Sequence, residues 1–228
     1  MNSRYDRNIG TISPREQKLL GEKSVCVIGC GGLGGGIIEG LTRLGVGRLT
    51  IVDGDVFDIS NLNRQVLSNE DNIGMLKAEE GMRQMGQINS ETRICPVCAF
   101  YTEENSREII SGHDVVIDAL DNINTRKILE DACEEENIPL VHGAIAGWHG
   151  QVAVIMPGDR LIHTLYDGDE NYGMEKETGN PSFTPAVTGA LQVAETLKLL
   201  LNREGVLANK VLTVDILNHQ YELIEFGD

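Results

Sequence analysis

The sequence has no cysteine after Cys133, and its five cysteines form no framework of regularly spaced pairs. This distribution argues against a disulfide-stabilised scaffold and fits a reducing compartment. Cys95 and Cys98 have Cys-x-x-Cys spacing, but they lie in a segment that we predict to be a strand, and no second pair accompanies them. We therefore expect both to be ordinary strand residues and the chain to hold no zinc.

Basic residues and long apolar runs are also scarce. The chain has 19 Lys and Arg against 35 Asp and Glu, which gives a formal net charge of −16. Because nucleic-acid backbones are bound by clustered Lys and Arg, we expect no nucleic-acid partner. No apolar segment follows the charged start, and no run approaches the length of a membrane span, so we expect no membrane partner and a cytoplasmic location.

A glycine-rich turn is the strongest positive signal. The residues 24–34 read SVCVIGCGGLG, a short apolar strand that runs into a turn and then a predicted helix. Gly29, Gly31 and Gly34 give the spacing G-x-G-x-x-G, with Gly32 inside it. Small residues at these positions let a nucleotide phosphate approach the unpaired N–H groups of a helix N-terminus. We predict that these four glycines line a phosphate site.

A carboxylate follows the next predicted strand. Arg48–Val52 ends at Asp53, and this side chain could accept hydrogen bonds from the two ribose hydroxyls of the same nucleotide. The order of strand, glycines, helix, strand and acid therefore predicts a nucleotide site. On these features alone, an NAD-binding oxidoreductase or a regulatory module fits as well.

Charged residues further along favour a triphosphate with magnesium. Arg64 lies in the segment NLNRQ, Lys77 follows the turn-forming Gly74, and Asp121 lies in the segment DALDN after an apolar strand. Arg and Lys can neutralise phosphate oxygens and a departing pyrophosphate, and a carboxylate at a strand end can hold Mg²⁺. A dinucleotide-dependent dehydrogenase needs little of this cationic chemistry.

These segments together carry a family resemblance. GCGGLG, IVDGD, SNLNRQ, the Lys77 region and DALDN occur in the order and approximate spacing of the ThiF/MoeB/HesA family, bacterial relatives of ubiquitin-activating enzymes. The chain resembles that family from Arg4 to the predicted helix that ends at Leu200. The resemblance implies an ATP-dependent adenylyltransferase, in which Mg-ATP adenylates a carboxylate and pyrophosphate leaves.

The resemblance also implies roles for individual residues. The glycines would line the phosphates, and Asp53, with Asp55 beside it, would bind the nucleotide. The remaining implied roles are triphosphate contacts for Asn61, Arg64 and Lys77, a magnesium ligand at Asp121, and an arginine, Arg7, that reaches the partner subunit's site in a homodimer. Arg64, Lys77, Asp121 and Arg7 would be the catalytic set.

The chain departs from the family in its cysteines. Many members hold a structural zinc with two late Cys-x-x-Cys pairs, and several carry a cysteine in the crossover loop, but this chain has neither. We therefore expect a separate protein to accept the sulfur or acyl group. Two substrates stay open. One is the C-terminal glycine of a small ubiquitin-like sulfur carrier, and the other is a small-molecule carboxylate, such as the guanylylpyridinol precursor of the [Fe]-hydrogenase cofactor.

The pattern of predicted elements gives the fold class. We predict helices over Pro14–Leu20, Gly34–Arg43, Met75–Gln87, Asn105–Ser111, Thr125–Glu136 and Val187–Leu200, alternating with strands up to Gly143. This alternation predicts an α/β fold, a Rossmann-like, mostly parallel sheet with helices on both faces. Later strands are predicted over Gln151–Met156, Arg160–Tyr166, Lys210–Asp215 and Gln220–Glu225, as an antiparallel extension of the sheet.

One adenylation domain over residues 1–228 accounts for the chain. Its nucleotide-binding part would span residues 1–150, and the antiparallel extension residues 151–228. A polar, acidic crossover loop is expected at about residues 166–183. Its acidity would repel a carboxylate substrate unless Lys176 or a partner compensates.

Overall fold

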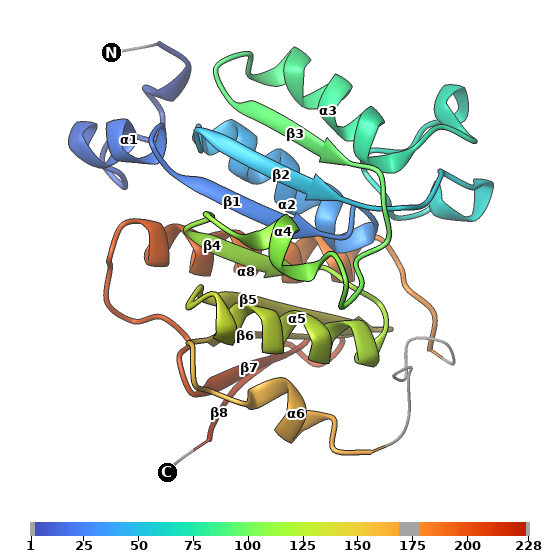
Figure 1. Ribbon diagram of the computed structural model, residues 1–228, viewed down its shortest axis with the longest axis vertical. Helices are drawn as coiled ribbons and strands as arrows, with labels where there is room; N and C mark the ends of the chain where they lie inside the picture. Colours follow the sequence, from blue (N-terminus) through green and yellow to red (C-terminus); the bar gives the residue numbers. More distant parts are fainter. Residues whose placement is uncertain (1–2, 169–177, 227–228) are drawn as a thin grey trace.

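The structure of the protein is a computed structural model, and residues 3–168 and 178–226 of it are described. Its centre is one sheet in the strand order β3-β2-β1-β4-β5-β6-β7-β8 (Figure 1). The strands are β1 (Ser24–Ile28), β2 (Arg48–Val52), β3 (Arg93–Val97), β4 (Val115–Asp118), β5 (Leu140–Ala146), β6 (His149–Ile155), β7 (Lys210–Asp215) and β8 (Gln220–Glu225).

Helices and short 3₁₀ turns connect these strands. The α-helices are α1 (Pro14–Leu20), α2 (Gly32–Leu44), α3 (Lys77–Ile88), α4 (Ser106–Ile110), α5 (Ile123–Glu135), α6 (Leu161–Leu165) and α8 (Phe183–Leu200). The 3₁₀ turns are η1 (Ser3–Tyr5), η2 (Ile59–Asn61) and η3 (Glu70–Asn72). Among the described residues, no helix has both the length and the apolar character needed to cross a membrane.

The strands β1 to β5 pair in parallel, and β6, β7 and β8 continue the sheet in antiparallel fashion. Every residue of β1 and β4 is buried, as expected for parallel strands that helices cover on both faces. The predicted fold class, a mostly parallel sheet with an antiparallel extension, is confirmed.

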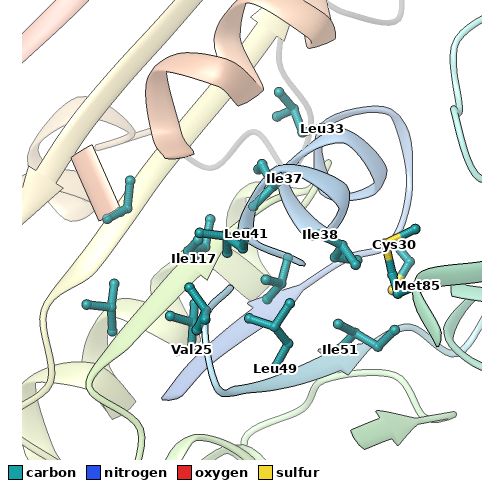
Figure 2. Close-up of a cluster of buried hydrophobic side chains, with 14 of the residues drawn as sticks. Val25, Cys30, Leu33, Ile37, Ile38, Leu41, Leu49, Ile51, Met85 and Ile117 are labelled. Atoms are coloured by element: carbon teal, nitrogen blue, oxygen red, sulfur yellow. The ribbon is translucent and has the colours of Figure 1, made fainter. Parts of the chain in front are cut away.

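Two hydrophobic clusters lie on opposite faces of the sheet. On one face, α2 presents Ile37, Ile38 and Leu41 toward Val25 and Leu49 of the strands (Figure 2), and α3 and α8 join the same cluster. The other cluster joins α4, α5 and α6 to the opposite face. In Figure 1, α5 lies in front of the sheet and α8 behind it. The chain therefore forms three layers, and the connections between layers meet at the carboxyl ends of the parallel strands.

The predicted strand over Arg160–Tyr166 is wrong, because this segment forms the helix α6. Its N-terminal amides are satisfied by a distant carboxylate: Glu130 of α5 accepts from the backbone N–H of Ile162 at 2.7 Å and of His163 at 3.1 Å. A short apolar run is ambiguous between strand and helix, and here tertiary capping decides.

A further boundary differs from the sequence prediction, and one predicted segment lies largely outside the described residues. α8 begins at Phe183, before Pro185, which is tolerated in a first helical turn because its missing N–H would be unpaired there in any case. The crossover loop predicted at residues 166–183 falls largely on residues 169–177, which lie outside the described residues together with Lys176.

Candidate active site

The glycine-rich turn joins β1 to α2, as predicted, and its glycines have two different roles. Gly29 has a φ of +103°, and a Cβ there would lie 2.5 Å from the carbonyl oxygen of Ala119. A Cβ at Gly34 would overlap the carbonyl oxygen of Gly29. These two glycines are required by close backbone packing, and Gly34 does not line the cavity described below.

Gly31 and Gly32 instead have room for a Cβ. A Cβ at Gly31 would meet the Gln65 side chain at 3.7 Å, and one at Gly32 would meet Arg64 at 3.6 Å, both ordinary contact distances. Gly31 is the N-cap of α2, and no side chain caps this helix. The first N–H groups of a 13-residue helix are therefore available to an anion at this point.

A cavity of about 430 Å³ lies directly in front of this turn. It forms at the carboxyl ends of β1, β2 and β4, where the strand order changes direction between β1 and β4. Ligands of open α/β sheets bind at such switch points. Of the predicted nucleotide-binding residues, those that line the cavity are Gly29, Gly31, Gly32, Asp53, Asp55, Arg64, Lys77 and Asp121.

Asp53 connects two turns at the edge of the cavity. Its Oδ2 accepts from the backbone N–H of Cys30 at 2.8 Å, and its Oδ1 accepts from the backbone N–H of Asp55 at 2.8 Å. Each oxygen keeps a further lone pair, because a carboxylate offers about four acceptor sites. Asp53 is thus fixed in orientation and still able to accept from hydroxyl groups.

Two cations reach the cavity from the segment between β2 and the first turn of α3. Lys77, the first residue of α3, is 7% exposed, and its Nζ lies 3.1 Å from Oδ2 of Asp55. Arg64 is more exposed, and its Nη1 donates to the carbonyl oxygen of Ser60 at 3.1 Å and to Asn63 at 2.9 Å. Both residues line the cavity to which the uncapped N-terminus of α2 also contributes.

Asp121 follows β4 in an exposed turn that lines the same cavity. The helix α5 is capped by its neighbour Asn122, whose Oδ1 accepts from the backbone N–H of Thr125 at 2.8 Å, so Asp121 is not used as the cap. Within the described part of the chain, no group of three or more His, Cys, Asp or Glu could hold a metal ion by itself. A single carboxylate fits Mg²⁺, which commonly takes one or two carboxylates and completes its shell with phosphate and water oxygens.

The thiol of Cys30, which lies in the glycine-rich turn, is protonated more strongly than an ordinary cysteine thiol. Burial raises the pKa of Cys30 well above its ordinary value, and the nearby Asp53 carboxylate raises it further. Burial also raises the pKa of Cys98, with Glu79 adding to the shift. Neither residue is favoured as a thiolate nucleophile.

Two predicted site residues lie elsewhere. Asn61 ends η2 and is 9% exposed, and its Oδ1 accepts from the backbone N–H of Asp58 at 3.1 Å, so it shapes the turn before Arg64. Arg7 is exposed in the N-terminal segment, where the neighbouring Tyr5 packs beside Gly45 at the C-terminus of α2. Since 13 helical residues span about 20 Å, Arg7 lies far from the glycine turn of its own chain.

Sequence reasoning missed several residues that line the cavity. They include Gln65, Phe100, Tyr101, Leu120, Thr125, Arg126 and Asn180. Gln65 follows Arg64 directly in NLNRQ, and its buried Oε1 has no hydrogen-bond partner. The aromatic and aliphatic members provide an apolar wall suited to a nucleotide base.

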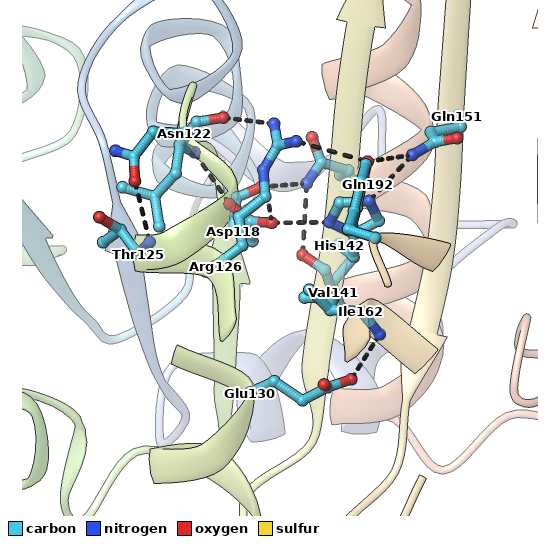
Figure 3. Close-up of polar contacts among 12 residues, drawn as sticks. Asp118, Asn122, Thr125, Arg126, Glu130, Val141, His142, Gln151, Ile162 and Gln192 are labelled. Carbon is cyan, nitrogen blue, oxygen red and sulfur yellow. Dashed lines mark hydrogen bonds and ion pairs between the residues drawn. The ribbon is translucent and has the colours of Figure 1, made fainter. Parts of the chain in front are cut away.

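A buried polar network surrounds Asp118, the last residue of β4, at the start of the turn that carries Asp121 (Figure 3). Asp118 and His142 are fully buried, and Nδ1 of His142 lies 2.6 Å from Oδ2 of Asp118. The other ring nitrogen of His142 lies 3.2 Å from Nε2 of Gln151, which also donates to the hydroxyl of Tyr166 at 2.6 Å. Arg126 closes the ring, because its Nε lies 3.4 Å from Oδ2 of Asp118 and its Nη1 lies 3.4 Å from the Tyr166 hydroxyl.

Comparison with known proteins agrees with this geometry. The SAMP-activating enzyme E1 of Haloferax volcanii is 36% identical over 228 residues, which are 98% of this chain and 84% of that protein. The sulfur carrier protein ThiS adenylyltransferase of Bacillus subtilis is 36% identical over 211 residues, which are 90% of this chain and 62% of that protein. The chain thus spans less than two thirds of the second relative.

A solved structure shows the same fold. E. coli MccB, crystallised with ATP, superimposes with a TM-score of 0.83 at 22% identity, covering 100% of this chain and 72% of that one. The ThiF family matches residues 5–227. With that match and with relatives above 30% identity over nearly the whole sequence, the chain belongs to the ThiF family.

Proposed function

We infer that the protein is an ATP-dependent adenylyltransferase that activates the C-terminal carboxylate of a ubiquitin-like sulfur carrier. The observation that carries this inference is one cavity in which an uncapped helix N-terminus converges with the cations Arg64 and Lys77 and the carboxylate of Asp121. The names of the two relatives, which refer to SAMP activation and ThiS adenylylation, favour a carrier protein over a small-molecule carboxylate.

The proposed reaction needs positioning and charge stabilisation more than covalent help. A carboxylate oxygen of the substrate attacks the α-phosphorus of ATP, a new P–O bond forms, and the bond to the pyrophosphate oxygen breaks with its electron pair. The N-terminus of α2 would hold phosphate oxygens, and Arg64 and Lys77 would neutralise the charge that develops on pyrophosphate. A magnesium ion at Asp121 would add further compensation.

The site is proposed to be completed by a second copy of the chain. Arg7 lies beyond the reach of its own cavity, and the family resemblance assigns it to the partner's triphosphate. A two-fold homodimer would place one Arg7 at each of two equivalent sites. We further propose that the enzyme works in the cytoplasm without zinc, and that a separate protein accepts the activated group.

Pyrophosphate exchange tests the proposed reaction. Labelled pyrophosphate should enter ATP when the protein is mixed with a carrier that ends in Gly-Gly, and the same carrier without its last glycine is the matched control. A small pyridinol carboxylate tests the alternative substrate. Exchange that responds to the small carboxylate and ignores every carrier would contradict the proposal.

Calorimetry tests the choice of nucleotide. ATP with magnesium should bind, because Arg64 and Lys77 offer charge that a triphosphate needs, and NAD should not. Binding of NAD without binding of ATP would contradict an adenylyltransferase.

A further inference from the structure

We propose that Arg126 binds the carboxylate group of the substrate that is to be adenylated. The proposal rests on the proposed function and concerns a residue that the family motifs quoted above do not contain. Arg126 lines the cavity together with Leu120, Asp121 and Asn122.

Arg126 enters the cavity from the opposite side to the other cations. It belongs to α5, which packs on one face of the sheet, whereas Lys77 begins α3, which packs on the other face. Arg64 contacts the region around Gly32, on the same side as Lys77. Among the described residues that line the cavity, the cations are these three, and Arg126 stands apart from the two in front of the glycine turn.

The guanidinium is held rigidly by its surroundings. Arg126 is 8% exposed, its Nη2 donates to the carbonyl oxygen of Leu120 at 2.5 Å, and its charge lies 5.8 Å from the ring centre of Tyr166. Figure 3 shows the side chain extending from α5 over Asp118 and His142. A guanidinium fixed in this way loses little conformational entropy when it binds a ligand.

These contacts leave donors unused. A guanidinium carries five N–H groups; Nε faces Oδ2 of Asp118 at 3.4 Å as an ion pair, and the four terminal N–H groups donate one hydrogen bond to Leu120 and one to Tyr166. Asp118 does not depend on Arg126 for hydrogen bonds, because it already accepts from His142 and from the backbone N–H of Leu120 at 2.9 Å. The donors left for a ligand are therefore terminal N–H groups of Nη1 and Nη2, and a carboxylate matches the planar fork that they form.

The reaction also needs a positive charge at this place. A carboxylate and an α-phosphate repel each other, and the cavity wall already carries Asp53, Asp55 and Asp121. Lys77 is engaged by Asp55 at 3.1 Å, and Nη1 of Arg64 is engaged by the Ser60 carbonyl oxygen at 3.1 Å and by Asn63 at 2.9 Å. Arg126 pairs with Asp118 through Nε alone, so we assign its terminal N–H groups to the incoming carboxylate.

Binding measurements on two forms of the carrier test this role. One form ends in a glycine carboxylate and the other in the uncharged glycine carboxamide, and each is titrated into the protein with a non-hydrolysable ATP analogue and magnesium. The wild-type protein should prefer the carboxylate by about tenfold to a hundredfold, the range expected for a charge-assisted hydrogen bond. Arg126→Gln should bind both forms equally and keep its affinity for the ATP analogue.

Two further variants complete the design. Arg107→Gln, which removes an exposed arginine paired with Glu135 on the neighbouring helix surface, is the matched control and should keep the full preference. If Arg126→Gln does not fold, as judged by circular dichroism, Arg126→Lys replaces it. That variant retains the buried charge but not the fork, so its preference for the carboxylate should fall below that of the wild type.

The outcomes separate this inference from the proposed function. An unchanged preference in Arg126→Gln, or in Arg126→Lys where that variant is used, overturns the role of Arg126, although carrier-dependent pyrophosphate exchange by the wild type would still stand. A wild-type protein that binds no carrier and shows no exchange overturns both. In steady-state assays, Arg126→Gln should raise KM for the carrier and leave KM for ATP unchanged.

Discussion

In the parallel half of the sheet every residue of β1 is buried, whereas in the antiparallel half every residue of β8 is exposed. Around β1 the backbone itself is tightly packed, since neither Gly29 nor Gly34 has room for a Cβ. On β8, Tyr221 and Leu223 are 62% and 50% exposed. The cavity therefore lies where close backbone packing tolerates almost no added side-chain atoms. At the other end of the sheet, the exposed residues of β8 should tolerate substitution far better.

The largest effect should come from adding a methyl group where two backbone segments of the glycine turn are in close contact. In Gly34→Ala the new methyl overlaps the Gly29 carbonyl, so the free energy of unfolding should fall by about 3 kcal/mol and nucleotide binding should be lost. Gly86→Ala in α3, where a Cβ meets nothing within 4 Å, is the matched control and should gain up to about 1 kcal/mol from helix propensity. Urea unfolding measures both. Equal free energies of unfolding for Gly34→Ala and Gly86→Ala would contradict the claim that Gly34 has no room for a Cβ while Gly86 does.

The second effect is the recovery of activity when two inactive variants of the chain form mixed dimers. Arg7→Ala and Asp121→Ala should each be nearly inactive alone, and their mixture should recover about a quarter of wild-type activity. Random exchange puts half of the dimers in the mixed form, and one of their two sites keeps both residues. Pyrophosphate exchange measures the recovery. No recovery after proven subunit exchange, or full activity of a monomer, would contradict a shared site.

A smaller expected effect is on how stability depends on pH, which should differ between α3, beside the parallel strands, and the antiparallel strand β8. The side-chain hydrogen bond from Arg83 is the main cause that lowers the pKa of Glu80 in α3 from 4.5 to about 2. A lowered pKa stabilises the fold above the unfolded value, and this stabilisation is lost as pH falls from 4.5 toward about 2. Glu80→Gln should therefore flatten the acid decline of stability in that window.

The matched substitution lies on the exposed strand. The ion pair with Lys210 lowers the pKa of Glu225 in β8, but this carboxylate is open to solvent. Because solvent screens exposed ion pairs, they contribute little to the free energy of unfolding. Glu225→Gln should therefore change the loss of stability at acid pH less than Glu80→Gln does. Thermal unfolding between pH 2 and pH 5 compares the two, and a larger effect at Glu225 would reverse the ranking.

The sequence predicted those parts of the site that local rules govern. Asp53 and Asp121 follow apolar strands, and the carboxyl ends of parallel strands meet at one edge of a sheet, so their convergence with Gly31 could be inferred. Arg126 could not be found in this way. It occupies an ordinary position inside α5, and the Tyr166 that orients it comes 40 residues later.

The wrongly predicted strand and the position of Asn61 both reflect contacts that residue type does not reveal. The helix α6 is only five residues long, too short to show a helical period, and Glu130, which caps it, lies more than 30 residues earlier. Asn61, whose triphosphate contact stays a prediction, uses its Oδ1 to accept from the backbone N–H of Asp58 in the turn before Arg64. In each case a contact distant in sequence, or a local turn, decided what the residue type alone left open.

The ring of polar contacts around Asp118, at the start of the turn that carries Asp121, has a consequence for the order in which the chain assembles. Asp118 belongs to β4, but its partners include His142, Gln151 through that histidine, and Gln192 of α8, which donates to its carbonyl oxygen at 2.8 Å. Long sequence separations delay such contacts during folding. The turn that carries Asp121 therefore reaches its final form only after α8 has docked, so a ribosome that has released only the first 150 residues has not yet produced a finished nucleotide site.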